Sequence, residues 1–411
     1  MLNVPLPAYQ AAAFRRIDVT ETFDCMRDWH LFGPGPKRIL SLDGGGVRGA
    51  ITVAFLERIE SLLSDRFGRE IRLGDWFDLV GGTSTGALIA GALALGYRTH
   101  QIKDFYLKLA PSCFQPTRWG IPLFQAKFNA DGLRAEILKI VQDRPLCSPD
   151  LITGLCVITK RMDTCSPWIL ANNPRAPYWN DAKTHDGNSK YKLATLVRAS
   201  TAAPHFFDPE AFPISKTEDG LFIDGGVTPY NNPSLALFQM ATFKPFGICW
   251  PTGPDKLAVT SVGTGTYRPH FSYSDEGFGR FAKLAYYALM SLMTDAETMT
   301  LAQMQWMGEC LTEWKINSEI GSLAKELPQG GKMFRFMRYD VKLETNWLRE
   351  ELDVKVSERD AERYRGMDNP AIVDDIYEIA KQAAEKQVKV EHWLGDMPAF
   401  LKAPASAAAK A

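Results

Sequence analysis

The 411-residue sequence has no excess of charge of either sign, and it has few histidines and cysteines. It holds 47 basic and 48 acidic residues, so no overall field attracts nucleic acid, and any contact with a membrane surface must be local. The seven cysteines include no Cys-x-x-Cys pair, and their odd number argues for thiols in a reducing compartment rather than for a disulfide framework or a zinc site. No cluster of His, Cys and carboxylate residues has the spacing of metal ligands, so we expect no metal site.

Features of secreted and membrane-spanning chains are also absent. The opening MLNVPLPAYQ has two prolines and no early positive charge, which does not fit a secretory signal. An uncharged run of 19 residues, Leu79 to Tyr97, contains five glycines and divides into a strand, a turn and a helix, so we do not interpret it as a membrane span. The sequence therefore predicts a cytoplasmic protein without a transmembrane segment.

The composition is that of a globular protein with a sizeable core. Hydrophobic residues make up 45% and charged residues 23%, and the length suffices for one large domain with appendages or for two ordinary domains. The breaker Gly33-Pro34-Gly35-Pro36 closes an N-terminal lead-in over residues 1–36. Residues 346–395 are typical of charged surface helices and residues 403–411, APASAAAKA, of a frayed tail, so 346–411 is expected to be a C-terminal helical extension.

The stretch from Leu79 to Gly91, LVGGTSTGALIAG, places a serine in a strand-to-helix turn. An apolar strand runs into Gly82-Thr83-Ser84-Thr85-Gly86 and continues directly as a helix of small residues. Glycines on both sides of Ser84 fit a turn with strained backbone angles, the nucleophile elbow, which exposes the hydroxyl above the sheet and leaves the amide of Thr85 free to bind an oxyanion. A Gly/Ser loop without chemistry is the alternative for such a motif taken alone.

A glycine-rich loop follows the first strand of the expected domain. Residues 37–42 form a short apolar strand, and Asp43-Gly44-Gly45-Gly46-Val47-Arg48-Gly49 precedes an amphipathic helix over residues 50–67. Three consecutive glycines present backbone amides at a helix N-terminus. Such amides suit an anion, either a phosphate or a transient oxyanion.

A nucleotide-binding loop is the alternative, and it fits less well. The loop has no Gly-Lys-Ser/Thr ending, which a P-loop requires. Gly44, Gly46 and Gly49 do satisfy the bare Gly-x-Gly-x-x-Gly pattern of dinucleotide-binding proteins, with an acidic residue near the required distance. Against this function, Asp43 would place a negative charge beside a pyrophosphate, and Ser84 would have no role.

A carboxylate ends a later candidate strand, in the run Leu221-Phe222-Ile223-Asp224-Gly225-Gly226. The pattern delivers Asp224 to the C-terminal edge of a sheet, where sites of α/β folds form. A serine hydroxyl needs a base to take its proton, and Asp224 is the candidate; the alternative is a turn with local hydrogen bonding only. Only His270 and His392 follow Asp224, and neither lies in a motif that completes a Ser, Asp, His triad.

Taken together and in order, these motifs resemble those of the patatin-like phospholipase family. They are Asp-Gly-Gly-Gly-Val-Arg-Gly at 43–49, Gly-Thr-Ser-Thr-Gly at 82–86, Arg-Ala-Ser-Thr-Ala-Ala-Pro at 198–204 and Asp-Gly-Gly at 224–226. The resemblance spans residues 37–345. It implies a catalytic domain with a three-layer α/β/α fold and a central, mostly parallel sheet. It also implies a lipid acyl hydrolase that uses a Ser-Asp dyad without histidine, metal or cofactor.

The resemblance also implies a role for each motif residue. The nucleophile would be Ser84 and the base Asp224, and the oxyanion hole would be formed by Gly44, Gly45 and Gly46 with help from Arg48. The expected reaction is cleavage of fatty-acid esters of phospholipids or other glycerolipids through an acyl-enzyme, with transient contact at a membrane surface. Two other functions stay open. One is an effector phospholipase that is inactive until a partner or small molecule binds. The other is a non-hydrolytic nucleotide or phospholipid binder that uses the glycine loop. Head group, acyl position, chain length, activator and oligomeric state are not specified by these motifs.

Overall fold

The structure is a computed structural model that describes residues 23, 25–113, 128, 130–180, 187–268 and 280–393. Most of the N-terminal lead-in, the frayed tail expected over residues 403–411 and His270 lie outside the described residues. Within the described ranges, no helix combines the length and the apolar character that crossing a membrane requires.

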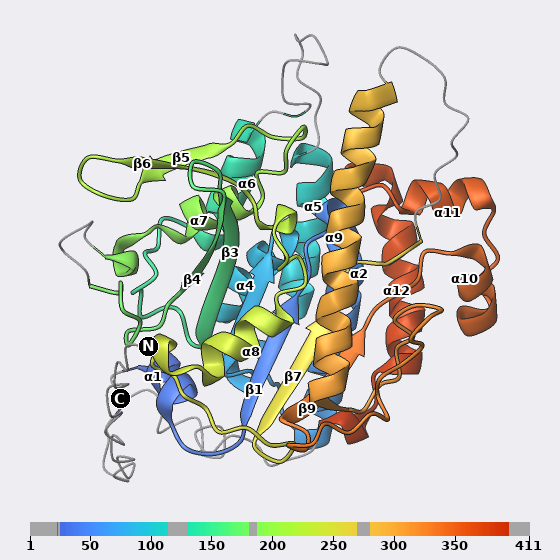
Figure 1. Ribbon diagram of the computed structural model, residues 1–411, viewed down its shortest axis with the longest axis horizontal. Coiled ribbons are helices and arrows are strands. Elements are labelled where there is room, and N and C mark those ends of the chain that lie inside the picture. The colour runs from blue at the N-terminus through green and yellow to red at the C-terminus, as the bar shows by residue number, and fades with distance from the viewer. Residues whose placement is uncertain are drawn as a thin grey trace, which may run out of the picture.

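A nine-stranded sheet forms the centre of the described part of the chain (Figure 1). The strands are β1 (Lys37–Leu42), β2 (Leu79–Thr83), β3 (Gly154–Arg161), β4 (Ser166–Ala171), β5 (Glu210–Pro213), β6 (Asp219–Asp224), β7 (Leu257–Val262), β8 (Gly308–Cys310) and β9 (Phe334–Tyr339). Their order is β5-β6-β3-β2-β1-β7-β9-β8, and β4 pairs with β3 outside this path. The strands from β3 to β8 in this order are parallel, whereas β4 and β6 run antiparallel to β3. The sheet is therefore mostly parallel, as predicted.

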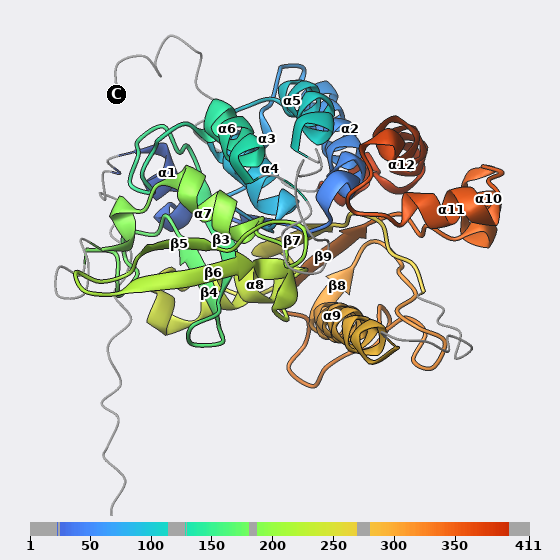
Figure 2. The same ribbon diagram turned by 90° about the horizontal axis from the view of Figure 1, so that it is seen from above.

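Helices cover both faces of this sheet (Figure 2). One face carries α2 (Gly49–Phe67), α4 (Thr85–Ala94), α5 (Thr99–Cys113), α6 (Ala130–Val141), α7 (Leu193–Ser200) and α12 (Val373–Gln387). The other face carries α8 (Ser234–Thr242) and the long α9 (Arg280–Met307). Shorter helices are α1 (Met26–Phe32), α3 (Leu73–Trp76), α10 (Thr345–Leu352) and α11 (Glu358–Tyr364). The arrangement confirms the predicted three-layer α/β/α fold.

The side chains of β1 show how one strand holds the three layers together. Successive side chains of a strand point to opposite faces. Leu40 and Leu42 lie in one buried cluster with residues of α2 and α4, while Ile39 lies in a second cluster with residues of α8. All six residues of β1 are buried, Lys37, Arg38 and Ser41 included, because the strand is covered on both faces.

The C-terminal region packs on the same domain. Ile376 and Ala380 of α12 are fully buried in the cluster that contains Ile59 and Leu63 of α2, and the two helices lie side by side in Figure 2. The division into a lead-in over 1–36, a catalytic domain over 37–345 and an extension over 346–411 stays a proposal about domain organisation.

Candidate active site

Ser84 lies in the turn between β2 and α4, at the position predicted for a nucleophile elbow. Its backbone has a positive φ of 55° with ψ −124°, a conformation that residues other than glycine rarely adopt. A Cβ on Gly82 would collide with the backbone of Gly86, and a Cβ on Gly86 would collide with the carbonyl of Leu42 in β1. The turn is therefore tight enough to require both glycines, and it presents Ser84 to a cavity.

The register of three strands brings Asp224 to Ser84. In β3, Ile158 pairs with Thr83 of β2, and the next residue, Thr159, pairs with Asp224 of β6. Ser84 Oγ lies 2.6 Å from Asp224 Oδ2, and the hydroxyl donates a hydrogen bond to the carboxylate. The pair thus has the contact that proton transfer from serine to carboxylate requires.

Asp224 lies in a nearly dry environment. Only 5% of the residue is exposed, and its Oδ1 accepts a hydrogen bond of 2.6 Å from the amide of Gly226. Burial raises the pKa of Asp224 to about 6, although the hydrogen bonds from Ser84 and Gly226 and the charge of Arg198 oppose the rise. A carboxyl group with this pKa is ionised at neutral pH and is a stronger base than an ordinary aspartate.

A second serine holds the elbow in place. Ser200, at the end of α7, accepts a hydrogen bond of 2.8 Å from the amide of Ser84 and donates one of 2.6 Å to the carbonyl of Ile158 in β3. This contact fixes the backbone of the elbow against the strand that also pairs with Asp224. The sequence motif at 198–204 contains Ser200, but its spacing gave no sign of the role.

The glycine loop offers free amides at two of the three predicted positions. The amide of Gly44 donates to the carbonyl of Asn231 at 3.2 Å, so it is already used. Among the described residues, the amides of Gly45, Gly46 and Thr85 have no acceptor. Gly46 has a φ of 59°, and a Cβ there would collide with the carbonyl of Met367, which accepts the neighbouring Val47 amide at 2.9 Å.

Arg48, which follows the three glycines of this loop, is buried rather than exposed to solvent. Its Nη1 donates a hydrogen bond of 3.1 Å to the carbonyl of Gly265. Its guanidinium lies 5.7 Å from the ring centroid of Tyr267. Arg48 also lines the cavity, so its positive charge contributes to the field at the loop.

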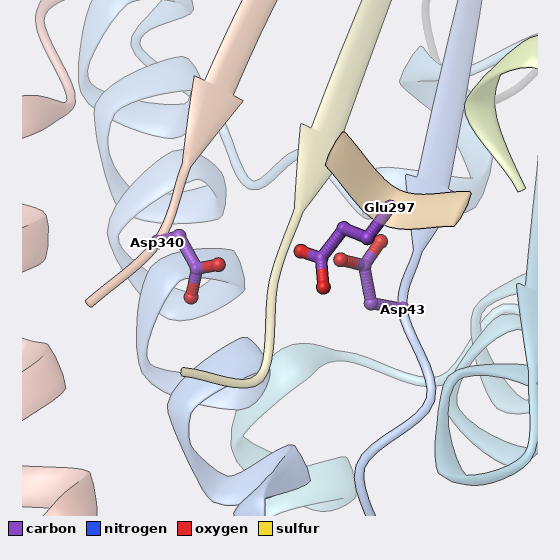
Figure 3. Close-up of side chains that lie close together, drawn as sticks. All are labelled: Asp43, Glu297 and Asp340. Carbon is purple, nitrogen blue, oxygen red and sulfur yellow. The ribbon is translucent and has the colours of Figure 1, made fainter. Parts of the chain in front are cut away.

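Three carboxylates meet beside the glycine loop, from Asp43 after β1, Asp340 after β9 and Glu297 in α9 (Figure 3). Their oxygens are close enough to hold a cation, and Arg338 of β9 supplies one. Its Nη1 lies 2.7 Å from Asp43, and its Nη2 lies 2.7 Å from Asp340 and 3.1 Å from Glu297. Although burial opposes it, the charges of the three carboxylates raise the pKa of Arg338. Arg338 therefore offsets part of the negative charge of this cluster and forms an ion pair with Asp43, the residue that begins the glycine loop.

A cavity of about 550 Å³ joins these groups. Ser84, Asp224 and the glycine loop lie on its wall. Much of the remaining wall is apolar and comes from Leu88, Leu133, Pro204, Phe206, Phe207, Val227, Met293 and Leu301. No histidine from the described part of the chain lines it, and His392 is instead hydrogen-bonded to the hydroxyl of Tyr339 at 2.7 Å. The cavity therefore combines a Ser-Asp pair with a large apolar surface.

The protein has a three-layer α/β fold, and the serine on its strained strand-to-helix turn is hydrogen-bonded to a buried aspartate. These features place it in the class of α/β proteins with a nucleophile elbow. The comparison with known families agrees: residues 40–238 match the family model of patatin-like phospholipase. Residues 40–238 thus match a patatin-like phospholipase domain, which confirms the predicted resemblance over this part of the chain.

Individual relatives and a solved structure show how far the similarity extends. The chain is 32% identical over 262 residues to patatin-like protein 1 of Arabidopsis thaliana, covering 57% of this chain and 60% of that protein. It is 32% identical over 233 residues to a cGAMP-activated phospholipase of Escherichia coli, covering 55% of this chain and 62% of that protein. The crystal structure of VipD from Legionella pneumophila aligns with 86% of this chain over 67% of its own length, at 13% sequence identity and a TM-score of 0.33. The chain spans about three fifths of the length of these curated relatives.

Proposed function

We propose that this protein is a serine acyl hydrolase that cleaves fatty-acid esters of phospholipids or other glycerolipids through a Ser84–Asp224 dyad. The observation that carries the proposal is the 2.6 Å hydrogen bond between Ser84 on its strained turn and a buried carboxylate with a raised pKa. The match of residues 40–238 to a phospholipase family supports the lipid ester as the substrate class.

In the first half of the reaction, Ser84 Oγ attacks the ester carbonyl carbon while its proton passes to Asp224 Oδ2. The carbonyl π electrons move to oxygen, and the resulting oxyanion accepts hydrogen bonds from backbone amides. Gly45, Gly46 and Thr85 have amides without an acceptor in the described structure, so the proposed hole rests on them, with Gly44 shaping the close approach to Ser84. Collapse of the intermediate expels the alcohol of the lipid, which takes the proton from Asp224.

In the second half, water replaces the departed alcohol. Asp224 accepts a proton from the water, whose oxygen attacks the acyl carbon of the Ser84 ester. A second oxyanion forms in the same hole, the bond to Ser84 Oγ breaks, and the proton returns to Ser84 as the fatty acid leaves. The apolar wall formed by Leu88, Phe206 and Met293 suits the acyl chain in both steps.

Labelling by a fluorophosphonate tests the nucleophile. This reagent reacts with activated serines, so Ser84→Ala is expected to abolish labelling while the protein stays folded by circular dichroism. Ser318→Ala is the matched control, because Ser318 also lines the cavity, and in the described part of the chain its hydroxyl has no hydrogen bond to a carboxylate. Labelling of Ser84→Ala as strong as that of the wild type would refute the assignment.

Chelation tests the proposal that no metal takes part. Backbone amides suffice to bind the oxyanion, and Arg338 already forms ion pairs with Asp43, Glu297 and Asp340. Ester hydrolysis is therefore expected to survive prolonged incubation with EDTA. A loss of turnover that calcium restores would show that these carboxylates bind a metal during the reaction.

A second candidate, an enzyme that is inactive until a small molecule binds, is favoured by the similarity to a cGAMP-activated phospholipase. Measuring ester turnover with and without cGAMP separates the two functions. A basal rate unchanged by cGAMP supports the constitutive enzyme, and a large increase supports the activated one. We further propose transient contact with a membrane surface, since a lipid ester has to leave the bilayer to reach Ser84.

A further inference from the structure

The cavity has a cationic side that the proposed reaction does not use. Arg268, Lys315 and Lys342 all line it, and they come from the segments that follow β7, β8 and β9. Glu344 lines the same side. These residues lie far from the dyad in sequence, and the family motifs include none of them.

The backbone holds these cations in place. Thr266 and Lys342 form a parallel bridge, with the amide of Leu343 donating to Thr266 at 2.7 Å. Lys342 Nζ lies 3.3 Å from the carbonyl of Lys315 and 5.0 Å from the ring centroid of Trp314. Trp314 is itself buried, and its carbonyl accepts a 2.7 Å hydrogen bond from Gln305.

Positive charge is in excess on this side of the cavity. Within the described residues, none of the three cations forms an ion pair with a carboxylate. Glu344 Oε1 accepts a hydrogen bond of 3.1 Å from the backbone amide of Arg268. Burial and the charges of Arg268 and Lys315 lower the pKa of Lys342, although Glu344 and Asp340 oppose this. The positive charges of Arg268, Lys315 and Lys342 repel one another, and a bound anion would relieve this repulsion.

The order of the strands places this cationic side relative to the dyad. Ser84 follows β2, the apolar residues Leu133 and Phe206 belong to the half of the fold that contains β3 and α6, and Lys342 follows β9. In the sheet order β3-β2-β1-β7-β9-β8, three strand spacings, about 14 Å, separate β2 from β9. The side chain of Lys342 extends toward the segment that follows β8, since Nζ lies 3.3 Å from the carbonyl of Lys315, and one cavity connects this segment with Ser84. A ligand with an ester at Ser84 and a chain against the apolar wall would therefore carry its polar end toward the lysines.

We propose that Arg268, Lys315 and Lys342 form a subsite for the phosphodiester of a glycerophospholipid head group, which makes the enzyme select phospholipids over neutral acylglycerols. The proposal rests on the proposed lipid hydrolase function. Ammonium and guanidinium groups donate charge-assisted hydrogen bonds to phosphate oxygens, and an acylglycerol offers no anion to accept them.

Binding of non-hydrolysable lipids tests the subsite without relying on turnover. The probes are a short-chain dialkyl ether of phosphatidylglycerol and the matching dialkyl ether of glycerol, titrated calorimetrically into the full-length protein below their micelle concentrations. The phosphate-bearing ether is expected to bind about 10-fold more tightly, the size of one charge-assisted hydrogen bond. Lys315→Gln/Lys342→Gln is expected to lose this preference, and so is Arg268→Gln in part.

Lys325→Gln is the matched control, because it removes an exposed lysine that lies between β8 and β9 in the sequence and does not line the cavity. Its preference for the phosphate-bearing ether should match the wild type. If Lys325→Gln lowers the preference as much as the double variant does, the effect is general surface charge and the subsite is refuted. An equal affinity of the wild type for both ethers refutes it as well.

Two further measurements complete the test. The first distinguishes a lipid from a soluble phosphodiester as the ligand, and the second distinguishes a failure of the subsite from a failure of the proposed function. Glycerophosphoglycerol, which has no chains, should bind far more weakly than the ether lipid; equal affinity would assign the site to a soluble phosphodiester and overturn the lipid proposal. Hydrolysis of phosphatidylglycerol and of diacylglycerol in neutral mixed micelles gives the ratio of kcat/KM values, which the double variant should lower about 10-fold. If the protein prefers the phosphate-bearing ether but hydrolyses neither lipid, only the proposed hydrolase function is refuted. If it hydrolyses both lipids without preferring the phosphate-bearing one, only the subsite is refuted.

Discussion

In the proposed reaction Asp224 takes the proton of Ser84, with which it shares a hydrogen bond of 2.6 Å. Asp224→Asn keeps the shape but removes the proton acceptor, so kcat for a soluble ester is expected to fall by about 100-fold or more, as loss of a general base does. His205→Ala and His392→Ala are the controls, because neither histidine lines the cavity. A folded histidine variant as inactive as Asp224→Asn would mean that the base is assigned wrongly.

The pKa of Asp224 also predicts the pH profile of the reaction. The base acts only when ionised, and burial raises its pKa to about 6. As the pH falls below about 6, Asp224 becomes protonated, so kcat/KM is expected to drop about tenfold per pH unit. The measurement is kcat/KM on an uncharged soluble ester from pH 4.5 to 8. A profile that is flat down to pH 4.5 would contradict a buried carboxylate base.

The same raised pKa predicts that Asp224 lowers the stability of the fold at neutral pH. The folded state holds the proton more tightly than the unfolded chain, whose value is near 3.8, so the free energy of unfolding decreases as pH rises from about 4 to 6 and stays low above that range. Asp224→Asn has no charge at any pH. It is expected to gain up to about 3 kcal/mol at pH 8, a gain that shrinks between pH 6 and pH 4. Urea unfolding of the wild type and the variant at pH 8 and at pH 4 checks this. The same difference in the free energy of unfolding at the two pH values would contradict the prediction.

Arg338 forms ion pairs with three carboxylates, so its removal should lower the free energy of unfolding. Arg338→Met leaves Asp43 and Asp340 buried without a cation, and the expected loss is about 3–5 kcal/mol in the free energy of unfolding. Arg335→Met is the matched control on the same strand, since its one ion pair among the described residues, with the exposed Glu309, is worth less than about 1 kcal/mol. Similar losses in the two variants would show that the carboxylate cluster does not depend on Arg338.

At the scale of elements, the sequence predicted what short segments determine by themselves. The elbow at Ser84, the strand over 37–42 and the helix from residue 50 all depend on local apolar runs and glycines, and the structure has them there. The direction of β6 was not predictable in this way, because it depends on how a distant segment returns to the sheet. Asp224 ends its own strand as predicted, but β6 runs antiparallel to β3, and Asp224 pairs with Thr159, one residue beyond the Ile158–Thr83 pair that ends β2.

The residues that the sequence did not reveal act through contacts between distant segments. Ser200 holds the amide of Ser84 from 116 residues away, and Arg338 reaches Asp43 from another strand. No spacing pattern in a single sequence identifies such partners, because they come together only in the folded sheet. The roles proposed for Ser84, Asp224 and the glycine loop remain predictions that the experiments above test.

The contact between α12 and α2 depends on a buried apolar face. Ile376 is fully buried between these helices, so Ile376→Ala should lower the free energy of unfolding by about 2–5 kcal/mol, through lost burial and the cavity left behind. Lys381→Ala is the control on the same helix, because Lys381 is exposed. Urea titration followed by circular dichroism measures both. A change below 1 kcal/mol in Ile376→Ala would mean that α12 is held only loosely.

At the scale of the whole molecule, the C-terminal region touches the proposed site although the family match ends at residue 238. The carbonyl of Met367 accepts the hydrogen bond of the Val47 amide in the glycine loop, and Met367 also lines the cavity. The region beyond residue 345 therefore supports the backbone that offers the free amides of Gly45 and Gly46. Its removal should affect the site as well as the stability of the fold.

Deleting residues 346–411 tests whether this region is a separable extension. The deletion exposes the apolar surface of α2 that α12 covers and removes the acceptor of the Val47 amide. We expect the shortened protein to aggregate or to lose cooperative unfolding, and any soluble fraction to lose fluorophosphonate labelling at Ser84. Deletion of residues 403–411 alone is the control, since its composition predicts a frayed tail, and it should leave labelling and unfolding unchanged. A soluble, cooperatively folded and labelled 1–345 fragment would show instead that residues 37–345 form a self-sufficient catalytic domain.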